Sequence, residues 1–144
     1  MARHDDNNAA SRSELDAAAA RVRDGSVTRS DGEWSASTVL AHIAFWDRMV
    51  LRRWRGTERY RRRYPDPLPD GIEDLVNDAA APAWGLLSPA QAAAEAIAAA
   101  EAVDAYVTRI PADVVAELGL TGKERLVDRS LHRREHLATL DRSG

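Results

Sequence analysis

The sequence predicts an all-α protein, and three observations support this prediction. Apolar residues recur three and four positions apart, as on one face of a helix, and no segment alternates like a strand. Four segments of helical length each follow a capping residue, namely Ser13, Ser35, Ser88 and Thr121. A proline-rich stretch separates the second segment from the third. We therefore expect a four-helix bundle with a long crossover between helices two and three and a short extra helix.

The first helix is expected between Ser13 and Gly25. Ser13 and Asp16 have the spacing of an N-terminal capping box, and glycine commonly follows the C-terminus of a helix. Residues 1–12 are polar, and we expect them to form a flexible N-terminal tail. Residues 13–144 are then expected to form a single bundle domain, since a chain of about 150 residues buries roughly 68–70% of its unfolded surface.

The second helix is expected from about residue 36 to residue 54 or beyond, ending near Gly56. Ser35 is its N-cap, and Trp34 is placed to pack on the helix as a hydrophobic staple. Apolar residues spaced four, three, four and four positions apart form one stripe along it: Val39, Ile43, Trp46, Val50 and Trp54. We expect the tryptophans of this stripe to pack in the core, although Trp46 lies close enough to His42 to line a pocket.

The crossover is expected over residues 61–71, which hold three of the six prolines and cannot form a regular helix. A short helix follows from residue 72 and is expected to stop before Pro82. Ser88, with proline at the next position, starts the third long helix, and Pro111 ends it. Residues 111–119 are interpreted as a turn. A capping box at Thr121 and Glu124 then predicts the last helix, over about residues 122–141.

The composition excludes several classes of function. The chain has no cysteine, so disulfides, thiolate metal sites and a cysteine nucleophile are excluded, and the sequence fits a reducing compartment. No apolar run approaches the roughly 20 residues of a membrane span, and the N-terminus lacks a secretory apolar segment. We therefore expect a cytoplasmic protein with no membrane partner. The formal net charge of −3 argues against a dedicated nucleic-acid binder.

Eight arginines lie between residues 48 and 63, interleaved with Trp54, Tyr60 and Tyr64. The interpretation we place first is a solvated helix end, where arginines complement the helix dipole and cover apolar surface. Guidance of an anionic substrate or thiol towards a site is the second interpretation. Contact with nucleic acid, through the backbone and stacked bases, is the third.

Three of the four histidines suggest a metal site. His132 and His136 lie four positions apart in a predicted helix, so their Cβ atoms are about 6 Å apart on one face and both rings can reach one ion. His42 lies on the apolar side of the second helix and is the candidate third ligand, because metal sites in bundles use facing helices. The alternatives are a hydrogen-bonded core histidine at 42 and a solvated pair at 132 and 136.

Two segments carry a resemblance to a known family. The stretch EWSASTVLAHIAFWDR (33–48) and the stretch HRREHLATL (132–140) resemble the DinB-like superfamily of metal-binding four-helix bundles, which includes mycothiol-dependent maleylpyruvate isomerases. The matching features are a tryptophan–serine helix start, a histidine eight residues after that tryptophan, and a terminal His-x-x-x-His helix. The resemblance implies a divalent metal, zinc or nickel, held by His42, His132 and His136. It also implies a homodimer.

The chemistry expected of such a site is metal-dependent. Three histidines leave a position open for a small-molecule substrate or thiol, and mycothiol is the thiol that the resemblance suggests. A carboxylate is expected to accept the free ring N–H of a ligand histidine; Asp128 is the first candidate and Glu135 and Asp47 are weaker ones, with an ordinary surface charge as the favoured interpretation of each. The first hypothesis is thus an enzyme using a low-molecular-weight thiol, as a transferase, isomerase or hydrolase. The alternative is a non-enzymatic dimeric bundle that binds a metal or small ligand, and the third hypothesis gives the histidines a structural role only.

Overall fold

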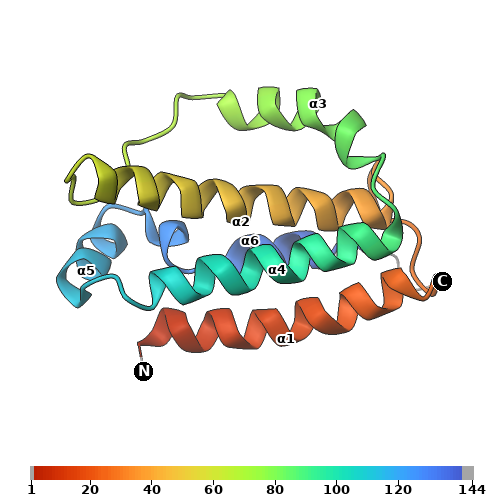
Figure 1. The fold of residues 1–144 in the computed structure, drawn as a ribbon, viewed down its shortest axis with the longest axis horizontal. Helices are drawn as coiled ribbons and strands as arrows, with labels where there is room; N and C mark the ends of the chain where they lie inside the picture. Colours follow the sequence, from red (N-terminus) through yellow and green to blue (C-terminus); the bar gives the residue numbers. More distant parts are fainter. Residues whose placement is uncertain (1, 141–144) are drawn as a thin grey trace.

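The computed structural model describes residues 2–140, which form six α-helices, one short 3-10 helix and no strand (Figure 1). The elements are α1 (Arg3–Arg23), α2 (Ala36–Arg59), α3 (Ile72–Trp84), α4 (Pro89–Val107), α5 (Ala112–Leu120), η1 (Glu124–Leu126) and α6 (Ser130–Leu137). This architecture confirms the prediction of an all-α bundle.

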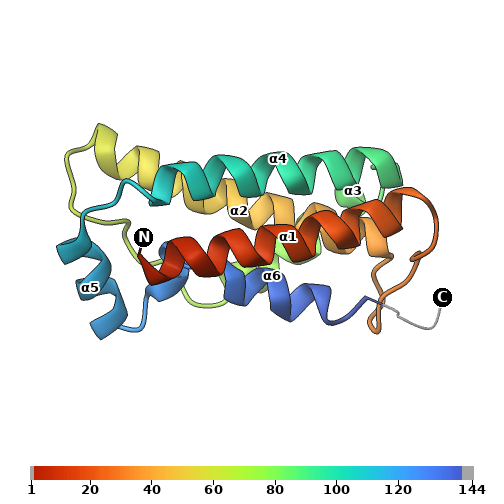
Figure 2. The ribbon, with the colours of Figure 1, turned by 90° about the horizontal axis from the view of Figure 1, so that it is seen from below.

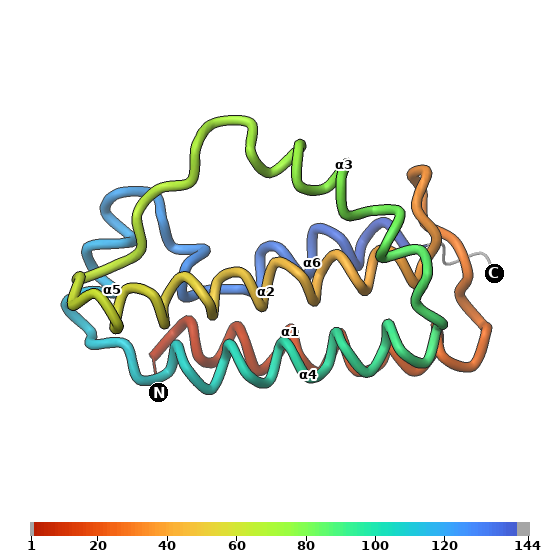
Figure 3. The backbone as a smooth tube through the Cα atoms, turned by 45° about the horizontal axis from the view of Figure 1, so that its top comes forward, coloured from red at the N-terminus to blue at the C-terminus, as the bar shows by residue number. Residues whose placement is uncertain are grey.

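Helices α1, α2, α4 and α6 form the four-helix bundle. Helix α4 packs against α1 and α2, and α6 packs against the same two helices on the other side, so the four helices enclose the core (Figure 2). The crossover and α3 carry the chain back along α2, which lets α2 and α4 run in the same direction (Figure 1). In Figure 3 this connection arches over α2 and α6. Residues of this crossover, among them Pro65, Pro67 and Leu68, line a pocket beside α2.

The core between α1, α2 and α4 is rich in alanine. Five alanines of α4 are almost completely buried there: Ala92, Ala93, Ala96, Ala99 and Ala100. Such small side chains let helix backbones approach closely, because little volume separates them. The other end of the core contains Trp54, whose indole N–H donates to the carbonyl of Leu126 at 2.7 Å. The prediction that Trp54 packs in the core is confirmed.

Two of the predicted helix starts have the expected capping geometry. The Oγ of Ser35 accepts the backbone N–H of Thr38 at 3.1 Å, and Ser88 and Gln91 form a complete capping box at the start of α4. The first cap lies less than two turns before His42 on the same helix. The serine therefore helps to fix the end of α2 that carries this histidine.

Replacing Ser35 with alanine is expected to lower the free energy of unfolding by about 1 kcal/mol, because a backbone N–H at the start of α2 loses its acceptor. Chemical denaturation monitored by circular dichroism measures the change. Ser13→Ala is the matched control, since Ser13 lies exposed inside α1 and caps nothing. Equal effects of the two substitutions would contradict the role of Ser35 as a cap.

The prediction of a flexible tail over residues 1–12 is wrong for residues 3–12, which form the first half of α1. His4, Asn8 and Ser11 are buried on the side of the helix that continues to Leu15. The amide of Asn8 donates to the carbonyl of Val127 at 2.9 Å and accepts the backbone N–H of Arg129 at 2.8 Å. A hydropathy pattern misses this half of the helix because its buried residues are polar. Residue 1 lies outside the described residues.

The C-terminal region also differs from the prediction. The interpretation of residues 111–119 as a turn is wrong, because residues 112–120 form α5, in which Val114 and Leu118 lie four positions apart and are both buried. Thr121 then ends α5 instead of capping the last helix, and Gly122 takes a positive φ of 71°. The single helix expected over 122–141 is divided into η1 and α6, which ends at Leu137. Residue 141 lies outside the described range.

The extra helix is longer than predicted, because α3 continues through Pro82 to Trp84. A proline lacks the N–H of a helical hydrogen bond. Pro82 lies in the last turn of α3, where the helix ends two residues later. The added turn buries Trp84, which is 7% exposed. Residues 82–84 therefore bring a tryptophan to the histidines described below.

Candidate metal centre

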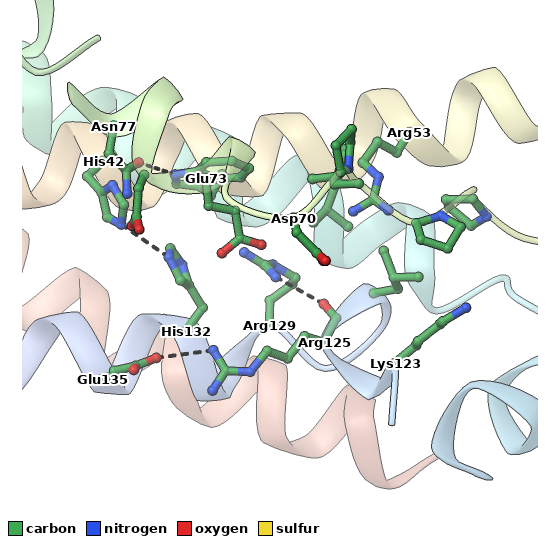
Figure 4. A pocket seen from close by; sticks show the side chains of 18 of the residues that line it. His42, Arg53, Asp70, Glu73, Asn77, Lys123, Arg125, Arg129, His132 and Glu135 are labelled. Atoms are coloured by element: carbon green, nitrogen blue, oxygen red, sulfur yellow. Dashed lines mark hydrogen bonds and ion pairs between the residues drawn. The ribbon is translucent and has the colours of Figure 1, made fainter. Parts of the chain in front are cut away.

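The structure brings the three predicted histidines together. The Nε2 atom of His42 on α2 lies 3.1 Å from Nε2 of His136 and 3.2 Å from Nε2 of His132, both on α6. Ring nitrogens of all three side chains lie within 4.8 Å of one another, a grouping that could hold a metal ion. Residues 42 and 132 are ninety positions apart in the chain and meet because α2 and α6 pack together (Figure 4).

Aromatic rings enclose His42. This side chain is only 2% exposed, and its ring centroid lies 4.9 Å from that of Trp34 and 5.3 Å from that of Trp84. Trp34 precedes α2 and Trp84 ends α3, and the two indole rings also contact each other, with their centroids 5.6 Å apart. The interpretation of His42 as an ordinary core residue fits its burial but not its contacts, because its Nε2 faces other ring nitrogens.

The donor set fits a divalent ion. Zinc binds histidine nitrogen at about 2.0–2.1 Å, so two ligands at a tetrahedral angle lie about 3.3–3.4 Å apart, close to the distances between the Nε2 atoms here. Hydrogen bonding alone does not account for the arrangement. A neutral imidazole has a single N–H, and the Nδ1 atoms of His42 and His132 are buried without a partner among residues 2–140. Three convergent neutral nitrogens are a common ligand set for zinc, nickel and similar ions.

Burial favours the neutral form of these rings. Burial, with a smaller contribution from the neighbouring His136, lowers the pKa of His42 to about 3. Burial also lowers the pKa of His132, with the nearby Arg129 adding to the effect, and burial lowers the pKa of His136. All three imidazoles are therefore neutral near pH 7, which is the form that binds a metal.

None of the carboxylates considered as partners of the histidines serves in that way. Asp128 accepts hydrogen bonds from Asn7 and Ser130, and Glu135 pairs with Arg125 at 3.1 Å. Asp47 is completely buried and pairs with two arginines, so its interpretation as a surface charge is also wrong. Within residues 2–140, the Nδ1 atoms of His42 and His132 therefore lack a carboxylate partner.

A buried ion network holds α6 in place beside the histidines. The carboxylate of Asp47 on α2 accepts from Arg129 at 2.8 Å and from Arg133 at 3.0 Å. Arg133 is 0% exposed and also pairs with Asp104 on α4 at 2.8 Å. Because Arg133 lies between His132 and His136 in α6, its two carboxylate partners fix the rotation of the helix that presents both histidines.

The sequence contained a signal for this network. Asp47 lies four positions after Ile43 and three before Val50, so it occupies the buried stripe of α2. A carboxylate there needs a buried cationic partner, because an isolated buried charge is costly. Arg129 and Arg133 lie four positions apart on one side of the last helix and match that need.

A pocket opens directly beside the histidines. Its volume is about 630 Å³, and it lies between α2, the crossover with α3, and the η1–α6 segment (Figure 4). Trp46 lines it and donates its indole N–H to Oδ1 of Asn77 at 2.8 Å, which ties α3 to α2. Trp46 thus forms part of the pocket wall although it is only 8% exposed.

The arginines between residues 48 and 63 have several partners. Arg48 pairs with Glu95, Arg62 with Asp66, and Arg63 with both Asp113 and Glu117. These pairs are exposed and hold neighbouring segments together, in keeping with a solvated helix end. Arg53 differs, because it is half-buried and lines the pocket.

The fold and this centre define a four-helix bundle with a three-histidine group in its wall. A family model of the DinB superfamily matches residues 8–139, and the chain therefore belongs to the DinB superfamily. Comparisons with curated proteins and with solved structures gave no match. Within residues 2–140, no helix combines the length and the apolar character needed to cross a membrane.

Proposed function

We propose that the protein is a divalent-metal-dependent enzyme in which His42, His132 and His136 hold zinc or nickel. The observation that carries this proposal is the convergence of three histidine Nε2 atoms at one end of a pocket. Three protein ligands are typical of catalytic sites, which keep a position open for a substrate, whereas structural sites are closed by four. When bound, the ion would act as a Lewis acid and lower the pKa of a water or thiol at that position.

The co-substrate in this proposal is a low-molecular-weight thiol. The chain has no cysteine, so any thiolate used in the reaction must come from a second molecule. The pocket has room for one beside the histidines, with Trp46 on one wall and Asn77 on α3. Mycothiol is the thiol we propose first, on the basis of the family resemblance, for a transfer, isomerisation or hydrolysis reaction in the cytoplasm.

Thiol-dependent conversion of an electrophile tests this proposal, because a transferase consumes the thiol whereas an isomerase regenerates it. Metal-loaded protein is incubated with a panel of electrophiles that includes maleylpyruvate, with and without mycothiol or another small thiol, and loss of the electrophile is followed. We expect thiol-dependent conversion by the unaltered protein and by Arg134→Gln, since Arg134 is exposed on α6 and pairs with Glu14. We expect none with His136→Ala. If the metal binds but no electrophile is converted, the enzyme proposal is wrong and the non-enzymatic bundle that binds metal or a small ligand takes its place.

A homodimer is also part of the proposal. Leu75 on α3 and Leu86 after it are 64% and 84% exposed, and they give this side of the molecule apolar surface that a second copy would cover. Sedimentation equilibrium is expected to give about twice the chain mass of 15.8 kDa. A mass equal to that of one chain across the accessible concentrations would contradict the dimer.

A further inference from the structure

The pocket continues from the histidines along one face of α2. His42, Trp46, Val50 and Arg53 all line it, at spacings of four, four and three residues. Eleven residues of helix span about 16 Å at a rise of 1.5 Å per residue. Figure 4 shows His42 and His132 at one end of this space, and Arg53 and Lys123 at the other. The pocket is thus elongated, with histidines and cationic side chains at opposite ends.

Arg53 and Lys123 differ from the other cationic groups of the pocket in their pairing. Arg125 pairs with Glu135 at 3.1 Å, and Arg129 pairs with Asp47 at 2.8 Å. Arg53 donates to the backbone carbonyl of Asp66 at 2.7 Å, and no carboxylate of residues 2–140 lies within ion-pair distance of it. Lys123 likewise has no carboxylate partner in that range, although its Nζ lies 6.0 Å from the ring centre of Tyr64.

The environment of Arg53 leaves its charge poorly compensated. Burial lowers its pKa, and the charge of Arg129 lowers it further, whereas the charges of Glu73 and Asp66 act in the opposite direction. A guanidinium remains protonated all the same and keeps its planar set of donors. Charge-assisted hydrogen bonds to an anion would replace the water that this half-buried group has lost.

The acidic residues of the pocket do not fill this role. Asp70, Glu73 and Asp74 line the same space, but all three side chains are exposed to solvent. Water screens exposed carboxylates strongly, so they act weakly on Arg53 at a distance. They do oppose a polyanion such as nucleic acid, which would bring repeated phosphates past them. The pocket therefore favours a small ligand with a localised negative charge.

One side of the pocket between the two ends is apolar, while Asp70, Glu73 and Arg129 also lie along this space (Figure 4). Trp46 and Val50 of α2 face this stretch together with Leu68 of the crossover and Leu126 of η1. We propose that Arg53 and Lys123 bind a carboxylate or phosphate group at the far end of an elongated, largely apolar ligand whose reacting end lies at the histidines. This inference rests on the proposed function only in placing the reacting end of the ligand at the histidines. It adds a substrate class and a specificity-determining residue to that function.

Binding of dicarboxylates to the zinc-loaded protein tests the inference. Suberate, azelate and sebacate are titrated by calorimetry beside octanoate, nonanoate and decanoate, which have the same lengths but one carboxylate. We expect one of the dicarboxylates to bind about tenfold more tightly than its monocarboxylate counterpart, since its second carboxylate reaches Arg53. No advantage of any dicarboxylate in the unaltered protein would overturn the proposal.

Two variants and a control assign that advantage to Arg53. In Arg53→Gln the tenfold difference is expected to disappear, and in Arg53→Lys part of it is expected to remain, because charge is kept but the planar fork is lost. Arg52→Gln is the matched control, since Arg52 is exposed and does not line the pocket. A difference that survives in Arg53→Gln would overturn the proposal. If circular dichroism shows that Arg53→Gln is unfolded, Arg53→Lys becomes the decisive variant. An undiminished difference between dicarboxylate and monocarboxylate binding in Arg53→Lys would then overturn the proposal.

Zinc content separates this inference from the proposed function. Each protein is assayed for bound zinc before titration, and we expect equal zinc in the unaltered protein, Arg53→Gln and Arg52→Gln. If the unaltered protein binds no zinc, the proposed function fails. Loss of carboxylate binding in Arg53→Gln would then still support the anion site, and unchanged binding would overturn it. The affinity for the dicarboxylate is also measured with and without phosphate in the buffer. A lower affinity in phosphate shows that the site at Arg53 accepts phosphate as well as carboxylate, and an equal affinity shows that it accepts carboxylate only.

Discussion

Replacement of His136 by alanine is expected to weaken zinc binding more than about a hundredfold, because loss of an outer-shell partner already costs about 10–100-fold and a direct ligand contributes more. The Nε2 of His136 lies 3.1 Å from that of His42, so its removal leaves the ion with only two histidine ligands. Competition with a chromogenic chelator measures the affinity. The protein is produced without a histidine tag, because such a tag would bind zinc itself.

His4→Gln is the matched control for this result. His4 is the histidine of the chain that lies apart from the centre, and its Nε2 lies 3.4 Å from the carbonyl of Val107 at the end of α4. Its replacement removes an imidazole and leaves the three-histidine group intact, so zinc affinity is expected to stay unchanged. Equal zinc contents in the unaltered protein and in a variant with alanine at residues 42, 132 and 136 would contradict the metal centre.

Replacement of Asp47 by asparagine is expected to destabilise the protein by about 3–5 kcal/mol, since removal of one partner leaves buried charges uncompensated. Asparagine has nearly the same shape, so the change reports mainly the lost charge. Arg129 and Arg133 both bond to this carboxylate, and they are 4% and 0% exposed. Against a typical total stability of 5–15 kcal/mol, such a loss would be evident in urea denaturation as a large fall of the midpoint.

Glu14→Gln provides the comparison, because it breaks an ion pair of the same helix α6 at the surface. Glu14 and Arg134 are about half exposed, and pairs of this kind contribute about 0–1 kcal/mol. A loss below about 1 kcal/mol in Asp47→Asn would show that the buried network does not hold α6. We also expect Asp47→Asn to bind zinc more weakly than the unaltered protein in the absence of urea, since α6 presents two of the three histidines.

The sequence predicted α2 and the histidine group well, for identifiable physical reasons. Ser35 caps α2, the apolar stripe of α2 has helical spacing, and His42 lies on that side of the helix. Two histidines four positions apart share a helix face whatever the surrounding structure. Helix α6 is shorter than predicted, but the prediction that residues 132 and 136 share a face still holds, because one helical turn is enough to bring them to the same side.

Other parts escaped prediction because polar residues hold them together. The first half of α1 is fixed by Asn8, which bonds to the chain near α6, and no apolar stripe marks it. Arg133 has a charged side chain that sequence patterns assign to the surface, but Asp47 and Asp104 stabilise it in the core. Such pairs depend on contacts between distant segments, which periodicity along one helix does not reveal. The same limitation applies to the pocket, since its crossover wall is an irregular segment.

The external crossover and α3 help to cover the histidine group. Helix α3 returns along α2 and places Trp84 5.3 Å from the ring of His42. The tie between Trp46 and Asn77 holds α3 there. Water is thus restricted around the histidines, and electrostatic interactions with a bound ligand are strengthened.

A crystal structure of the zinc-loaded protein tests the central claim most directly, through the coordination of the ion. The account predicts one zinc bound by the Nε2 atoms of His42, His132 and His136, each at about 2.0–2.1 Å, with a further position taken by a molecule other than the chain. Zinc bound at other residues, or three rings that turn away from one another in the presence of the ion, would contradict it.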